Sequence, residues 1–73
     1  MKTYTVKMIY DNGCWISSTG APLCLVLEAD SYDKLVKRVC LAAPEMLELN
    51  TGYTGPFKLN FVTEHSETLP EAV

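Results

Sequence analysis

Two carboxylates separated by one alanine, Glu28 and Asp30, are the closest approach in this sequence to a paired acid site. Paired carboxylates can hold a divalent metal ion, as they do in metal-dependent nucleases. Such sites usually draw acids from several elements, and residues 1–10 contain no Asp or Glu. We therefore expect these two acids to cap a helix and to keep the surface soluble, with a residual metal-dependent nuclease as the weaker alternative.

The other reactive side chains lack the neighbours that catalysis needs. His65 is the single histidine and lies among acids near the end of the chain, so the Ser17–Ser18 pair has no histidine positioned to complete a triad. The four glycines stand singly at turns and form no phosphate-binding loop. We predict no catalytic, cofactor-binding or metal-binding residue and hence no enzyme activity.

The three cysteines, Cys14, Cys24 and Cys40, are odd in number and widely spaced. They form no C-x-x-C motif, so neither a redox pair nor half of a zinc site is indicated. We predict that they are buried free thiols that pack as small apolar side chains. Free thiols are typical of the cytoplasm, which is the compartment that we predict for this protein.

Size and charge set further limits. A chain of 73 residues forms a single domain with a small core, for which dimerisation is a common source of extra burial. The net charge of −3 disfavours general binding to nucleic acid, which needs clustered Lys and Arg. No apolar run is long enough to cross a membrane, and the alternating N-terminus lacks the apolar stretch of a signal peptide.

Strict alternation of polar and apolar residues predicts a strand over residues 3–10. Asn12-Gly13 follows, which is the preferred pair for a two-residue hairpin turn, and residues 14–19 would return as the antiparallel partner. Residues 23–29 alternate again and predict a third strand, with Glu28 on the face away from the core.

A helix is expected directly after the third strand. Ser31, or Asp30, would cap it, and apolar residues then recur at helical spacing as far as Ala43. Pro44 lacks the N–H that an interior turn needs, so it should end or kink this helix and begin a second short one over residues 44–50.

Residues 57–63 alternate as a last strand, and residues 64–73 are acidic and without periodicity. The predicted order is therefore β-β-β-α-β. This order predicts an α+β fold in two layers, an antiparallel sheet of three to four strands with a helix on one face. One domain would span residues 1–63, followed by a flexible acidic tail over 64–73.

Two surface features are candidates for binding. The helix carries three basic residues on one side, Lys34, Lys37 and Arg38. A solvated surface is the simpler interpretation, and contact with an acidic partner or RNA is the alternative.

The second feature is the apolar content of the outer sheet face. Ile9 and Val26 are expected on that face, together with either Trp15 or Ile16. A contiguous apolar face would be an interface, so we expect a homodimer or a partner docked on the sheet.

Three segments resemble the HicB-like antitoxin superfamily: the hairpin Asp11–Trp15, the junction Leu25–Asp30 with Ser31 after it, and Pro44–Asn50. The likeness spans most of residues 3–63. It implies a partial ribonuclease-H-like fold that lacks the nuclease carboxylates. HicB-like antitoxins bind and neutralise a small basic HicA-type toxin, an mRNA-cleaving protein.

The resemblance therefore implies a bacterial, protein-binding module rather than an enzyme. Its negative charge suits a basic toxin, because complementary fields steer association. The competing hypothesis is a structural or oligomerisation module of unknown role. The predicted partner-binding residues are Trp15, Val26, Glu28, Asp30, Lys34, Lys37 and Arg38.

Overall fold

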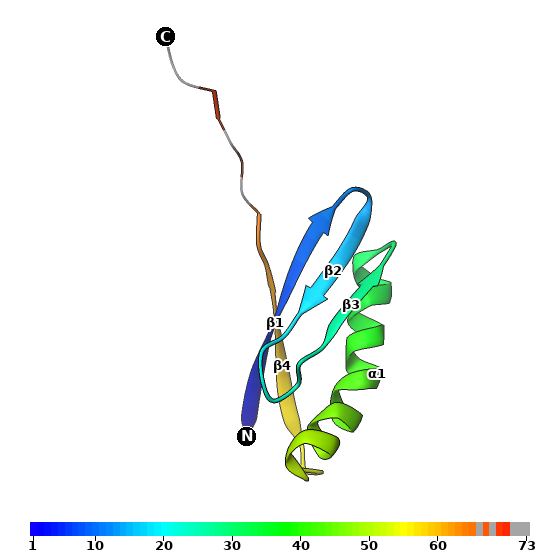
Figure 1. The fold of residues 1–73 in the computed structure, drawn as a ribbon, viewed down its shortest axis with the longest axis vertical. Helices are drawn as coiled ribbons and strands as arrows, with labels where there is room; N and C mark the ends of the chain where they lie inside the picture. The colour runs from blue at the N-terminus through cyan, green and yellow to red at the C-terminus, as the bar shows by residue number, and fades with distance from the viewer. Residues whose placement is uncertain (66, 68, 71–73) are drawn as a thin grey trace.

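The structure is a computed structural model, which describes residues 1–65, 67, 69 and 70. One helix packs on one face of a four-stranded sheet (Figure 1). The elements, in order, are β1 (Lys2–Asp11), β2 (Cys14–Ser18), β3 (Val26–Ala29), α1 (Tyr32–Thr51) and β4 (Phe57–Thr63). The predicted α+β class and the order β-β-β-α-β are confirmed.

The sheet has the strand order β3-β2-β1-β4, so β1 and β2 are the interior strands and β3 and β4 form the edges. β1 and β2, and β2 and β3, pair antiparallel, whereas β1 and β4 pair parallel. The sheet is therefore mixed rather than wholly antiparallel. The helix is the cause, because it carries the chain back along the sheet so that β4 starts from the same end as β1.

The turn between β1 and β2 is the one that Asn-Gly predicts. Asn12 has φ 51° and Gly13 has φ 81°, so both central residues take positive φ. The mirror-image turn of this kind matches the twist of the flanking strands. Asp11 and Cys14 close the hairpin as its last paired residues.

β3 is shorter than predicted, because the strand begins at Val26 rather than at residue 23. Cys24 takes φ 51°, which interrupts the extended chain. The preceding loop is nevertheless bonded to the residue that follows β2, since the backbone N–H of Leu25 donates to Oγ1 of Thr19 at 2.7 Å. Leu23 and Leu25 remain buried, as their predicted core-facing positions require.

The helix does not stop at Pro44, and the predicted second helix is the continuation of α1. The backbone N–H of Lys34 donates to Oγ of Ser31 at 3.2 Å, which confirms Ser31 as the N-cap. Gly52, with φ 76°, closes the other end by donating its N–H to the carbonyl of Glu48. The axis of α1 bends toward the sheet in its last turns (Figure 1).

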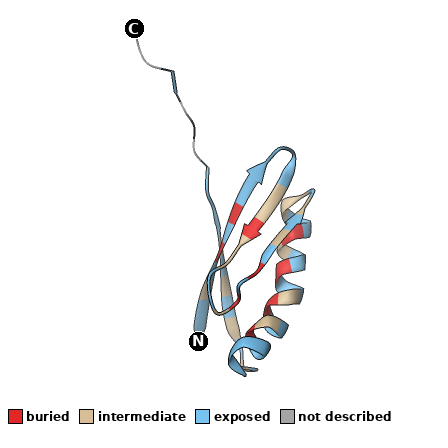
Figure 2. Ribbon diagram, in the orientation of Figure 1, coloured by how far each residue is buried: buried red, intermediate tan, exposed pale blue. Residues whose placement is uncertain are grey.

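The core lies between α1 and the sheet in two clusters. Val6, Met8, Leu35 and Val39 form the first. Leu23, Leu25, Ala43 and Leu47 form the second, under the last turns of the helix. Figure 2 shows the buried residues of α1 along the side that faces the strands. Leu59 packs against both clusters, and residues of α1 on both sides of Pro44 contribute to the core.

The predicted tail, residues 64–73, includes five positions that lie outside the described residues: 66, 68 and 71–73. Its described members form no helix or strand. None of the described segments forms a helix with the length and apolar content that crossing a bilayer requires.

Candidate functional site

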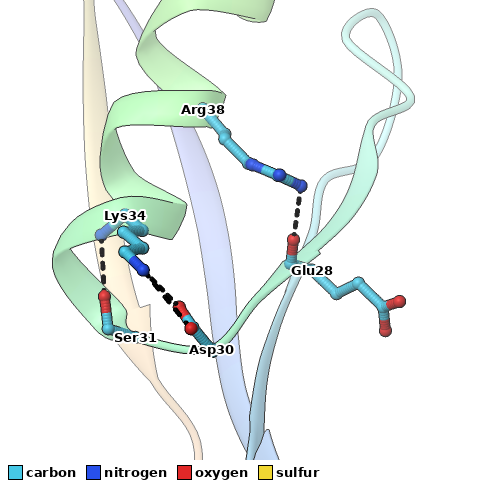
Figure 3. Close-up of polar contacts among 5 residues, drawn as sticks. All are labelled: Glu28, Asp30, Ser31, Lys34 and Arg38. Atoms are coloured by element: carbon cyan, nitrogen blue, oxygen red, sulfur yellow. Dashed lines mark hydrogen bonds and ion pairs between the residues drawn. The ribbon is translucent and has the colours of Figure 1, made fainter.

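The junction between β3 and α1 is held by short-range polar contacts (Figure 3). Nζ of Lys34 lies 3.1 Å from Oδ1 of Asp30, one helical turn before it. Ser31 stands between them and accepts the backbone N–H of Lys34. The Asp30 carboxylate therefore serves the start of the helix, where a negative charge also suits the helix dipole.

Glu28 does not join Asp30 in a paired acid site. Its carboxylate points away from Asp30, while Nη1 of Arg38 donates to the backbone carbonyl of Glu28 at 2.9 Å (Figure 3). Within residues 1–65, 67, 69 and 70, no group of three or more His, Cys, Asp or Glu side chains could hold a metal ion. At this junction Asp30 and Ser31 therefore stabilise the start of α1, and Arg38 binds the edge of β3 at Glu28.

The face of the sheet opposite α1, which we call the outer sheet face, carries an apolar residue on each of the four strands. Lys7 and Ser18 stand between Val62 and Val26 in the register, so polar residues interrupt this apolar band. The strand register places Ile16 beside Ile9 and opposite Glu28, and it places Val26 opposite Ser18. The band continues onto β4. Its members are Ile9, Ile16, Val26 and Val62, with Glu28 at its β3 end.

Three of the four apolar residues in this band are exposed. Val26 is 71% exposed, Val62 is 41% exposed and Ile9 is 37% exposed. Val62 was not among the residues predicted to bind, because only the parallel pairing of β4 with β1 places it next to Lys7. Lys7 forms an ion pair with Glu64 at 3.7 Å, so two charged side chains lie at the β4 end of the band.

Trp15 lies on the other face of the sheet. Its ring packs between Tyr10, at 5.3 Å, and Tyr32, at 5.1 Å, the distances joining ring centroids. It is half-buried against the first core cluster. The tryptophan therefore fastens the start of α1 to the hairpin and does not share a surface with Val26.

The basic residues of α1 are divided in their contacts. Lys34 bonds Asp30 and Arg38 bonds the Glu28 carbonyl, both at the β3 side of the helix. Lys37 is exposed on the helix surface. The structure thus uses two of the three charges to hold the strand-helix junction.

The three cysteines are free thiols, but the prediction that they are buried is wrong, because all three are exposed. Cys14 closes the hairpin, Cys24 lies in the loop before β3, and Cys40 lies at the flank of α1. None of these positions faces the core between helix and sheet. His65 is also exposed, and its Nε2 lies 2.7 Å from Oε1 of Glu67.

Comparison with known proteins identifies the fold and the family. A search of curated proteins gives no match. The crystal structure of a hypothetical protein, TTHA1013, from the extremely thermophilic bacterium Thermus thermophilus is similar, with a TM-score of 0.77 and 22% sequence identity over 93% of this chain and 100% of that one. At that identity the likeness shows the fold alone. A family model described as a domain of unknown function, DUF1902, matches residues 3–70. This chain therefore belongs to the DUF1902 family.

Proposed function

We propose that this chain is a bacterial, cytoplasmic HicB-like antitoxin module that binds and neutralises a small basic mRNA-cleaving toxin of the HicA type. The proposal assigns it no catalytic step of its own. The observation that supports it best is the outer sheet face, where exposed apolar residues lie beside the exposed carboxylate of Glu28. Exposed apolar residues that are grouped on one face of a protein are typical of a protein-binding surface.

Charge supports the same partner. The chain carries a net charge of −3, and Glu28 is exposed at the β3 end of the band. The side chain of Glu28 is exposed and points away from Arg38 and Asp30 (Figure 3). A basic partner would be attracted by the net charge and positioned by Glu28 and Val26 at contact.

The remaining predicted contacts have different parts in this proposal. Lys34 and Arg38 keep the junction and the β3 edge in place, so they act on the surface indirectly. Trp15 fixes the hairpin from the helix side. Lys37 is exposed on α1 and has no assigned role in toxin binding.

A binding experiment with a purified HicA-type toxin from the same organism tests the proposal. The toxin is titrated with the wild-type chain, and binding heat and RNA cleavage are both measured. We expect a complex that stops cleavage. Glu28→Lys should weaken binding about tenfold or more, which is about 1.4 kcal/mol.

The matched control is Glu45→Lys, because Glu45 is exposed on α1 and the change in net charge is identical. We expect it to lower the association rate slightly and to leave the complex intact. Equal losses from both variants would show that only net charge matters, which contradicts contact at the outer sheet face. A toxin that neither binds nor stops cleaving RNA would contradict the antitoxin proposal itself.

An oligomerisation module is the second candidate function, and one observation favours it. β4 is an edge strand of seven residues, and it borders a groove lined with apolar side chains. An edge of that length can pair with another strand.

A further inference from the structure

The two edges of the sheet differ in how far they are protected. β3 has only four residues, and Arg38 bonds the carbonyl of Glu28. The backbone N–H of Thr19 donates to the carbonyl of Leu25, so the backbone polar groups of residue 25 point toward β2. These groups alternate in direction along the strand, so those of Glu28 point away from β2, and Arg38 covers the open edge there. Short strands and covering side chains are common means of blocking edge pairing.

β4 is longer, and no side chain among the described residues covers its open edge in this way. The backbone N–H of Glu64 donates to the carbonyl of Met8 at 3.0 Å, so the polar groups of residue 64 point toward β1. These groups alternate in direction along a strand, so those of the odd-numbered residues point outward. The outward residues are Phe57, Leu59, Phe61 and Thr63. In the described part of the chain, no side chain bonds their outward N–H or C=O groups.

Apolar side chains follow the same edge on the helix side of the sheet. Phe57, Leu59 and Phe61 are half-buried and leave part of each side chain open. They line a shallow groove together with Cys40 and Pro44 from α1. The helix lies closest to β2 and β3, so it does not close this groove over β4.

The sequence of β4 is complementary to itself in one antiparallel register. If Phe61 of one copy lies opposite Phe61 of a second copy, then Lys58 lies opposite Glu64, and the symmetry forms this charge pair twice. Both charged residues are on the outer side of the strand and exposed. A register centred on Asn60 instead places Lys58 opposite Val62 and forms no charge pair.

We propose that this chain forms a two-fold dimer in which the β4 strands of two copies pair antiparallel, centred on Phe61, so that one sheet continues across both molecules. Main-chain bonds from the outward groups would hold the pair, and the two Phe61 rings would cover each other. Lys58 alone would oppose edge pairing, and Glu64 of the second copy offsets it. A chain this short gains burial that its own core cannot supply.

Charge reversal tests the register. Light scattering after size-exclusion chromatography, under reducing conditions because the cysteines are exposed, should give the mass of two chains for the wild type. Lys58→Glu and Glu64→Lys should each raise the dimer dissociation constant about tenfold, because like charges then oppose each other. The double variant should restore it. Lys37→Glu is the matched control, an exposed helix residue whose reversal should leave the dimer unchanged.

Each contrary result overturns the proposal. A wild-type chain that stays monomeric at high micromolar concentration shows that the β4 edge is not used between copies. A dimer indifferent to both reversals, or weakened equally by Lys37→Glu, is assembled through another surface. Circular dichroism of each variant checks that the fold is kept; the ion pair of Lys7 with Glu64 is exposed, so its loss costs the monomer little. This dimer does not depend on the toxin, and the two proposals fail in separate experiments.

Discussion

Two leucines in the last turns of α1 provide a direct test of the helix phase beyond Pro44. Leu47 is 1% exposed and belongs to the second core cluster, whereas Leu49 is 72% exposed. The two residues have the same chemistry and stand two positions apart on one helix. If α1 is continuous through Pro44, truncating them to alanine should have very different effects on stability.

The size of the difference follows from burial. Leu47→Ala removes a fully buried side chain and leaves a cavity, which costs about 2–5 kcal/mol. Leu49→Ala removes exposed surface and should change the free energy of unfolding by about 0.5 kcal/mol or less. For 73 residues, about 0.05–0.15 kcal/mol per residue gives a total stability of about 4–11 kcal/mol. Leu47→Ala therefore removes a large fraction of the total.

Urea unfolding followed by far-ultraviolet circular dichroism measures both changes. With a slope of about 1 kcal/mol per molar urea, Leu47→Ala should lower the midpoint by about 2 M or more. Leu47→Met conserves volume and should cost less than about 1.5 kcal/mol, so it supplies a folded variant if the alanine variant does not fold. Equal losses at the two leucines, or a larger loss at Leu49, would refute a helix that keeps one phase across Pro44.

Two further changes test how α1 is built. Pro44→Ala returns an N–H donor to the carbonyl of Cys40 and removes a ring from the helix interior, so we expect a gain of about 1–3 kcal/mol in the free energy of unfolding and a higher thermal midpoint. A lower midpoint would mean that the proline is needed to position the buried side chain of Leu47. Ser31→Ala removes the acceptor for the Lys34 N–H and should cost about 1 kcal/mol, whereas Ser31→Asp should keep most of the stability in the same unfolding assay; an equal loss from both variants would contradict the capping role of the hydroxyl.

Short-range features of this protein could be predicted from the sequence because neighbouring residues alone decide them. Asn12-Gly13 accepts the positive φ of a hairpin turn at little cost, and Ser31 can cap only the helix that starts beside it. The alternation in residues 3–10 and 57–63 gave the faces of β1 and β4 correctly, since burial of one face fixes the side-chain period.

Pro44 shows where local preference was overruled. The missing N–H favours a break, but Ala43 and Leu47 bury their side chains on either side of the proline. Burial of that continuous stripe outweighs one lost hydrogen bond, so the helix bends and continues. Sequence periodicity contained this signal, since Leu35, Val39 and Leu47 all lie on one helical face.

The sequence by itself determined the β-β-β-α-β order, the core-facing residues of β1, β3 and β4, and the N-cap at Ser31, because these depend on period and on neighbours along the chain. The tertiary structure decided which strands form the edges, that β4 runs parallel to β1, and that Val62 joins Ile9 and Val26 on the outer sheet face. It also decided that Trp15 faces the helix and that the cysteines are exposed. Strand order is set by how segments far apart in the chain share one core, and no local pattern encodes that choice.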